Sequence, residues 1–320
     1  MNILLTGAQG LLGQMLLKPL SEMGLVVAAA RRSYQPPGVS KGKRSYVEAN
    51  FDLRDYASIY RVFKEYNITH VVHSAAISHP GPSLDSPLTA VQINFDATVT
   101  LLEAARLFGV KRFIYMSSIG VYGRYRTNRV TEEHPMEGNS PYGVTKVASE
   151  LMGNCYDRTF DLPFVSLRYG QIYGPLRKTP CPIKMVVEAA ITHKPLHLSG
   201  GADACLHAIY QEDTIEPVQK LLLDETIRAE AFNIVDGYRH TLREVVTEIK
   251  KIVPDADISL GPGPLPQSVT GLPPEIGEDV LLDASKAMEK LEFKPQWTLP
   301  KALVHYVETL QKNYDVNKEI

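Results

Sequence analysis

The chain has 320 residues, and its hydrophobic content of 44% is that of an ordinary globular protein. Its formal charge of −2 gives no basic excess for nucleic acid or a membrane surface, and no apolar run approaches the roughly 20 residues that span a bilayer. Three scattered cysteines form neither a disulfide framework nor a zinc pattern, so we expect a reduced, cytoplasmic protein without a metal site. The length suffices for one large α/β domain and a smaller one.

The N-terminal stretch predicts a nucleotide-binding turn. A short apolar strand leads into Gly7, Gly10 and Gly13, and an amphipathic helix follows to about Met23. Glycines at this spacing allow a tight turn, close approach of a pyrophosphate and close packing of helix on strand. The phosphates then lie at the positive end of the helix. This context favours nucleotide binding over a merely structural turn.

The end of the second predicted strand, 25–30, indicates which dinucleotide binds. Folds of this kind usually carry an acid about 20 residues past the glycines, where it holds the ribose 2′-hydroxyl. This chain has Arg31 and Arg32 there. A guanidinium pairs with a 2′-phosphate through parallel hydrogen bonds, whereas a carboxylate would repel it. The sequence therefore predicts NADP(H) over NAD(H).

Later strands bring further side chains to the same edge of the predicted sheet. Asp52 follows the third strand, Ala75 follows the fourth, and Ser118 ends the fifth. Ligands bind at this carboxyl edge in open α/β sheets. His79 is a weaker candidate for a catalytic base, because a loop histidine before proline is more often polar surface. A long helix is expected over 86–109.

The stretch SPYGVTK, residues 140–146, predicts an acid–base pair. Tyr142 and Lys146 are four residues apart and share one face of a helix that Ser140 can cap. A nearby cation lowers the pKa of a phenol from its usual value of about 10. Tyr-x-x-x-Lys alone recurs on many helices by chance. The succession of glycine turn, strand-end serine and Tyr-x-x-x-Lys is far more specific.

In the C-terminal half, the chain is expected to leave the first domain after the sixth strand and to return to it later. The expected elements are a sixth strand over 162–167, a helix near 183–192, a strand and helix over 207–223, a helix opened by a Thr241–Glu244 capping box, and a last helix over 299–313. The loop 261–277 is either part of a substrate pocket or a plain connector.

The chain resembles the extended short-chain dehydrogenase/reductases, which are NAD(P)-dependent epimerases, dehydratases and reductases acting mostly on sugars and nucleotide sugars. The stretches that carry the resemblance are TGAQGLLG, FDLRD, HSAA, INFDATVTLLEAA, SSIGVYG, SPYGVTKVASE and LRYGQIYGP. The resemblance implies an α/β, Rossmann-type doubly wound parallel sheet with a smaller, mostly C-terminal substrate domain. Residues 1–168, with 208–236 returning to them, would bind NAD(P), and 169–207 with 237–320 would bind substrate.

The resemblance also assigns roles to residues. Tyr142 would be the catalytic acid–base, Lys146 would bind the nicotinamide ribose, and Ser118 would hold the substrate oxygen. The other predicted cofactor contacts are Gly7, Gly10, Gly13, Asp52, Leu53 and Ala75, together with Arg31 and Arg32. At Arg31 the chain departs from the family, which has an NAD-selecting aspartate at this position. The other predicted substrate contacts are Ser78, Asn94 and Gln171, and the family position of Asn94 near the active site is also compatible with a structural role. A homodimer would form through the helices around 95–109 and 142–160.

Several positions depart from the family pattern. Gln171 replaces an asparagine that usually contacts substrate, and Leu206 replaces an arginine that often holds a nucleotide phosphate. Arginine is hard to replace in bidentate phosphate binding, so a free sugar, a sugar acid or another carbonyl compound competes with a nucleotide sugar. Ile119 and Gly120 stand where the dehydratases usually have an acidic pair. This argues against dehydration.

Three functions are compatible with the sequence. The leading one is an NADP(H)-dependent oxidoreductase that transfers hydride at a hydroxyl or carbonyl carbon of a small sugar-like substrate. The second is an epimerase with tightly bound cofactor, which uses the same residues. The third is a non-catalytic, NADP-sensing regulator. Such regulators typically lose the tyrosine or the lysine, whereas this chain has both.

Overall fold

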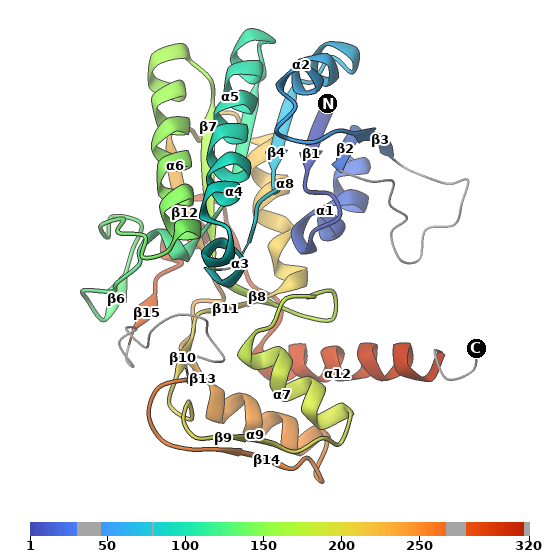
Figure 1. Ribbon diagram of the computed structural model, residues 1–320, viewed down its shortest axis with the longest axis vertical. Helices are drawn as coiled ribbons and strands as arrows, with labels where there is room; N and C mark the ends of the chain where they lie inside the picture. The colour runs from blue at the N-terminus through green and yellow to red at the C-terminus, as the bar shows by residue number, and fades with distance from the viewer. Residues whose placement is uncertain (31–45, 79, 267–279, 317–320) are drawn as a thin grey trace.

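A seven-stranded, wholly parallel sheet forms the centre of the protein, whose computed structural model describes residues 1–30, 46–78, 80–266 and 280–316 (Figure 1). Its strands are β1 (Asn2–Thr6), β2 (Leu25–Ala30), β3 (Tyr46–Asn50), β4 (His70–His73), β5 (Arg112–Ser118), β7 (Phe164–Tyr169) and β12 (Glu230–Ile234). Their order, β12-β7-β5-β4-β1-β2-β3, is that of a doubly wound α/β fold, which confirms the predicted fold class.

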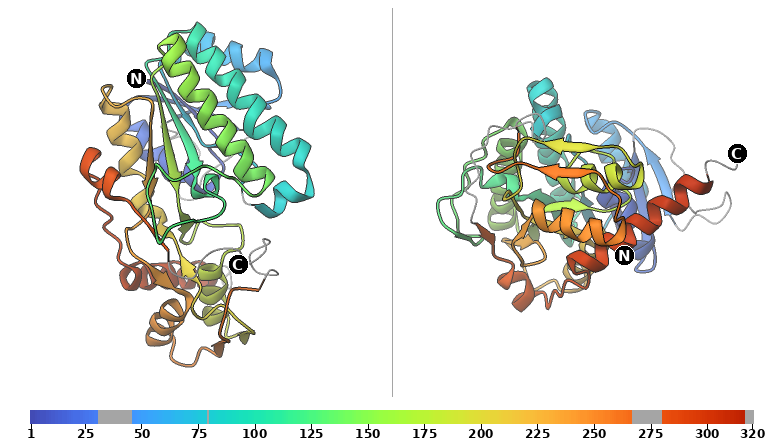
Figure 2. Two further views of the ribbon diagram at one scale, coloured as in Figure 1. Left: turned by 90° about the vertical axis from the view of Figure 1, so that its left-hand side faces the viewer. Right: turned by 90° about the horizontal axis from the view of Figure 1, so that it is seen from below.

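Helices cover both faces of the sheet (Figure 2). One face packs against α2 (Tyr56–Glu65), α5 (Ala97–Leu107) and α6 (Pro141–Phe160). The other packs against α1 (Leu11–Ser21), α8 (Glu216–Leu223) and α11 (Ser285–Lys290). Strands buried on both faces need no alternation with polar residues, which explains apolar runs such as Leu25–Ala30. The carboxyl ends of the strands are the part of the sheet left open to a ligand.

The long helix expected over 86–109 is present as an uninterrupted helical segment over 87–107, with a π turn in its middle. Short α3 (Pro80–Asp85) precedes α4 (Pro87–Val91), which continues through a π-helical stretch, η1 (Gln92–Asp96), into α5. The wider π turn, a feature frequent at functional sites, contains Asn94 and places its side chain in the protein interior. The periodicity of the sequence does not reveal this single turn.

A second, smaller lobe lies beyond the carboxyl ends of the strands (Figure 1). Its core joins α7 (Pro182–Ile191), α9 (Leu242–Ile252) and α12 (Leu299–Val316). The capping box of Thr241 and Glu244 at α9 is present as expected. Its short strands are β9 (Leu196–Leu198) with β14 (Ile258–Leu260), and β10 (Cys205–Leu206) with β13 (His240–Thr241). The predicted boundaries between the cofactor-binding and substrate-binding domains, at residues 168, 208 and 236, stay a prediction.

Short elements connect the lobe to the sheet. Strand β8 (Gln171–Tyr173) pairs in parallel with β11 (Ala208–Tyr210), and β6 (Arg129–Val130) pairs with β15 (Leu281–Leu282). The 3-10 turns are η2 (Ile119–Val121) and η3 (Gln211–Thr214). Strands of two or three residues are too short for a recognisable sequence pattern, so most of them were not predicted.

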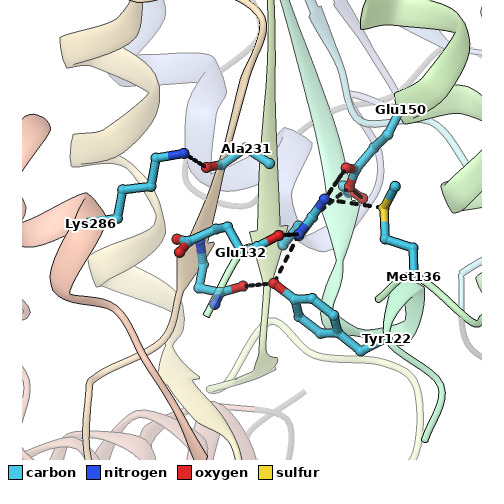
Figure 3. A network of polar contacts seen from close by, with 9 residues as sticks. Tyr122, Glu132, Met136, Glu150, Ala231 and Lys286 are labelled. Atoms are coloured by element: carbon cyan, nitrogen blue, oxygen red, sulfur yellow. Dashed lines mark hydrogen bonds and ion pairs between the residues drawn. The ribbon is translucent and has the colours of Figure 1, made fainter. Parts of the chain in front are cut away.

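A buried ion pair ties α6 to the sheet. Arg168 Nη2, on β7, lies 2.7 Å from Glu150 Oε2 on α6, and the two side chains are 5% and 0% exposed. The guanidinium also donates to the Tyr122 hydroxyl at 3.0 Å and the Glu132 carbonyl at 2.9 Å (Figure 3). On β5, Ser117 donates to Glu150 as well. This network holds the helix that carries Tyr142 against two central strands.

Within the described residues, no helix is long and apolar enough to cross a membrane.

Candidate active site

The glycine turn between β1 and α1 packs too closely against the protein's own backbone to accept side chains at Gly7 and Gly13. Gly7 has φ +68°, and a Cβ there would lie 2.6 Å from the Ala75 nitrogen. A Cβ on Gly13 would lie 2.2 Å from the Gly7 carbonyl oxygen. Gly10 is the N-cap of α1, and its N–H donates to the Gly7 carbonyl at 2.8 Å. Gly7 and Gly10 line the cavity at the N-terminus of α1, the place where a pyrophosphate binds in folds of this kind.

The other predicted cofactor contacts lie along the same cavity. Asp52, Leu53 and Ala75 all line it, and Asp52 is held by Arg54, whose Nε donates to its carboxylate at 3.0 Å. The Ala75 N–H donates to Thr6 Oγ1 at 3.2 Å, which fixes the end of β4 beside β1. Arg31 and Arg32 lie outside the described residues.

Ser118 and Tyr142 meet at the carboxyl end of β5. Ser118 Oγ accepts from the Gly120 N–H at 3.1 Å. A Cβ on Gly120 would lie 3.4 Å from Ser118 Oγ and 3.5 Å from Tyr142 Cε1, so both side chains surround this one glycine. The Ser140 hydroxyl caps α6 by accepting from the Gly143 N–H at 3.1 Å, as expected. Tyr142 therefore begins the helix beside the strand-end serine.

Lys146 lies one turn deeper on α6. Its Nζ donates to the Met116 carbonyl at 2.5 Å and lies 4.5 Å from the centre of the Tyr115 ring. The distance to the centre of the Tyr142 ring is 5.9 Å. Burial lowers the pKa of Lys146 to about 7, while Glu150 acts in the opposite direction. The ammonium is thus easily deprotonated near neutral pH.

The electrostatics of Tyr142 differ from the sequence-based expectation. Burial raises the pKa of the phenol, and the hydrogen bond with Ser118 and the charge of Arg177 lower it. Lys146, which was expected to lower the pKa of Tyr142, is not among the groups that shift it. The physical reason is that Lys146 is itself desolvated and its ammonium is directed to a backbone carbonyl.

The predicted substrate contacts divide into two groups. Ser78 and Gln171 line the cavity. Asn94 is buried, its Oδ1 accepts from the Ile77 N–H at 2.8 Å, and its Nδ2 donates to Thr145 Oγ1 at 3.1 Å. These bonds use its amide to join the loop after β4 to α6. They support the structural role of Asn94, the alternative that its family position allows, and its substrate contact stays a prediction.

One cavity of 820 Å³ joins the glycine turn, at Gly7 and Gly10, to Ser118, Tyr142 and Lys146. It runs from the glycine turn past Tyr142 into the smaller lobe, where it is lined by residues that sequence reasoning missed: Tyr125, Arg177, Lys178 and His207. Leu265, which belongs to the 261–277 loop, also lines the cavity. His79 and residues 267–277 lie outside the described chain.

Two polar atoms on the lobe side have no protein partner. Within the described residues, Gln171 Oε1 and His207 Nε2 are buried without a hydrogen bond. Burial, with a contribution from Arg239, lowers the pKa of His207 to about 4, so the imidazole is neutral near pH 7. Buried polar atoms are normally paired, so a bound molecule is the natural partner for both.

Comparison with known proteins identifies the family. The family model described as GDP-mannose 4,6 dehydratase matches residues 4–305. The chain belongs to this family, the extended short-chain dehydrogenase/reductases that act as sugar epimerases and dehydratases. This confirms the predicted enzyme class, an NAD(P)-dependent oxidoreductase of the epimerase/dehydratase family acting on a sugar-like substrate.

Individual relatives cover nearly the whole chain. A dTDP-glucose 4,6-dehydratase from Haemophilus influenzae is 27% identical, with 95% of this chain and 96% of that protein aligned. The crystal structure of UDP-glucose 4-epimerase from Thermotoga maritima with UDP-glucose has a TM-score of 0.84 and 26% identity, covering 98% of this chain and 100% of that chain. The Thermus thermophilus UDP-glucose 4-epimerase complex with NAD has a TM-score of 0.78 and 25% identity, covering 96% and 99%.

The positions that depart from the family pattern lie in the cavity. Ile119 and Gly120, which stand where dehydratases usually have an acidic pair, line it beside Tyr142. Leu206, which stands where the family often has a phosphate-binding arginine, lines it on the lobe side. These three departures from the family pattern therefore line the cavity in which substrate would bind.

Proposed function

We propose that Ser118, Tyr142 and Lys146 carry out an oxidoreductase reaction at a hydroxyl-bearing carbon of a sugar-like substrate. The observation that carries the proposal is the convergence of Ser118 and Tyr142 around Gly120, in the same cavity as the glycine turn. Two groups that hydrogen-bond one substrate oxygen are what a hydroxyl–carbonyl interconversion needs.

The three residues have separate tasks in this proposal. Ser118 holds the substrate oxygen, and Tyr142 takes or returns its proton. Lys146, whose Nζ lies 5.9 Å from the centre of the Tyr142 ring, would bind the ribose of the nicotinamide and so place the ring beside the reacting carbon. When bound, the nicotinamide ring supplies or accepts the hydride.

We propose NADP(H) as the preferred dinucleotide because of Arg31 and Arg32. Solved relatives such as the Thermus thermophilus UDP-glucose 4-epimerase contain NAD, so this preference calls for a direct test. NADPH and NADH would be titrated against wild type and Arg31→Ala. We expect tighter NADPH binding that Arg31→Ala abolishes. A clear NADH preference of the wild type would assign NAD instead.

An epimerase is the second candidate. It is favoured by the full-length similarity to the Thermotoga maritima UDP-glucose 4-epimerase. Ile119 and Gly120 leave the cavity without the acidic pair of the dehydratases, which speaks against dehydration. The protein would be purified without added cofactor and denatured, and any released nucleotide identified. Stoichiometric cofactor points to the epimerase, whereas an empty protein points to an exchanging reductase or dehydrogenase.

A further inference from the structure

The backbone N–H of Tyr142, at the start of α6, is held by a side chain from another helix. The first N–H groups of a helix have no carbonyl partner within it. Pro141 has no N–H, and the Gly143 N–H donates to the Ser140 hydroxyl at 3.1 Å. The Tyr142 N–H instead donates to Ser83 Oγ at 3.2 Å. The proposed acid–base residue is therefore attached to a side chain that lies 59 residues earlier in the chain.

The Ser83 hydroxyl is buried and oriented for this contact. Ser83 lies on α3, at the N-terminal end of α6 (Figure 1), and its exposed fraction is 0%. Its proton is donated to the Pro80 carbonyl at 2.7 Å, which leaves the oxygen as the acceptor for the Tyr142 N–H. Pro80 lines the cavity. Helix α3 thus joins the wall of the cavity to the helix that carries Tyr142.

The position of the Tyr142 ring depends on a backbone segment that helices usually hold weakly. Tyr142 lies in the first turn of α6, and helix ends fray. Its phenol forms a hydrogen bond with Ser118, and its ring lies against Gly120. The Tyr142 carbonyl accepts from the Thr145 hydroxyl at 2.8 Å. With Ser83 on the N–H and Thr145 on the carbonyl, both peptide groups of Tyr142 are fixed by side chains.

We propose that Ser83 is a positioning residue that holds Tyr142 beside Ser118 by accepting its backbone N–H. The inference rests on the proposed function of Tyr142 for its catalytic consequence. A displacement of about 1 Å at a reacting group can lower a rate by about 100-fold, so the loss of one backbone hydrogen bond at this residue should affect turnover. A serine that merely stabilised the fold would leave the chemical step unchanged.

The first experiment needs no substrate. Ser83→Ala removes the acceptor, and Ser83→Cys replaces it with a weakly accepting thiol of similar size. Ser86→Ala is the matched control, because Ser86 directly follows α3 and its hydroxyl donates to Thr89. Amide hydrogen exchange would be measured by NMR on the full-length protein saturated with its preferred dinucleotide. We expect the Tyr142 amide to exchange about tenfold faster in Ser83→Ala, less so in Ser83→Cys, and at the wild-type rate in Ser86→Ala. The Lys146 amide, deeper in α6, should be unaffected in all three.

Turnover of UDP-glucose with the preferred dinucleotide tests the catalytic consequence. We expect Ser83→Ala to lower kcat by about tenfold or more while the KM for the dinucleotide stays unchanged. If Ser83 acts through Tyr142, removing it matters only while the phenol is present. In the Tyr142→Phe background, Ser83→Ala should therefore change the residual turnover by less than about twofold.

Each outcome decides the inference. A wild-type exchange rate of the Tyr142 amide in either variant that lacks the hydroxyl overturns it, and so does a wild-type kcat in Ser83→Ala. Faster exchange along the whole of α6, or an equal loss of turnover in the Tyr142→Phe background, also overturns it, because Ser83 would then act on the fold as a whole. Unchanged turnover in Tyr142→Phe alone would instead refute the proposed function, while the exchange rates would still decide whether Ser83 holds the backbone of Tyr142.

Discussion

Tyr142 is the residue on which the proposed proton transfer depends. Replacing it with phenylalanine keeps the ring beside Ser118 and removes the hydroxyl. We expect Tyr142→Phe to lower turnover by about 100-fold or more, the usual contribution of a positioned acid–base group, without weakening dinucleotide binding. Steady-state kinetics and cofactor titration would measure the two effects. Tyr156→Phe is the control, because Tyr156 lies on the same helix and contacts Glu103 outside the cavity; equal losses in both variants would contradict the proposal.

Lys146 should give the unliganded protein a characteristic pH dependence of stability. Its pKa is about 7 in the folded protein, below its ordinary value of 10.5, because the ammonium is buried. Between these two pH values the unfolded chain binds more protons, so this residue makes stability rise with pH across that window and leaves it constant below. Relative to Lys146→Met, the wild-type free energy of unfolding should increase by at most about 1.4 kcal/mol per pH unit, the limit for one proton. Urea unfolding of both proteins from pH 7 to pH 10 tests this, and parallel curves would refute it.

At the scale of elements, the Arg168–Glu150 ion pair fixes the position of α6 against the sheet. Both side chains are almost fully buried, so removing one partner leaves an uncompensated charge. We expect Glu150→Gln or Arg168→Met alone to lower the free energy of unfolding by about 3–5 kcal/mol. The double variant Glu150→Leu/Arg168→Met should lose much less, because no buried charge remains. Urea denaturation of the three variants measures this, and additive losses would contradict it.

At the scale of the whole molecule, apolar residues on one face support the predicted homodimer. Helices α5 and α6 lie side by side (Figure 1), and their exposed apolar residues include Leu107, Val144, Leu151 and Phe160. Residues of this kind at the surface are typical of protein–protein contacts when they form a patch. We propose that this face joins two copies, as the family resemblance implied.

The oligomeric state tests this proposal. Light scattering should give twice the chain mass of 35.6 kDa for wild type. Leu151→Glu should give a monomer, because a charge would be buried in the contact. Leu223→Glu is the control, since Leu223 is also exposed, at 70% against 55% for Leu151, but lies on α8 across the sheet. A monomeric wild type would contradict the dimer.

The sequence by itself determined the features that depend on local rules. The glycine turn, the capped helix with Tyr142 and Lys146, and the apolar central strands each need a fixed residue type at a fixed spacing. Because carboxyl ends of parallel strands share one edge of a sheet, the meeting of Asp52, Ala75 and Ser118 in one cavity followed from their order in the chain.

The tertiary structure decided what depends on segments far apart in the chain. The π turn that places Asn94 inside, the pairing of β8 with β11, and the approach of Arg177 to the reacting end of the cavity have no local signal. The tertiary structure also decided the pKa of Lys146, because the burial that lowers it depends on all the segments that pack around the side chain. The sequence shows just the neighbours of Lys146 on its own helix. Local spacing thus identified the candidate reacting groups, and long-range packing set their burial and their contacts.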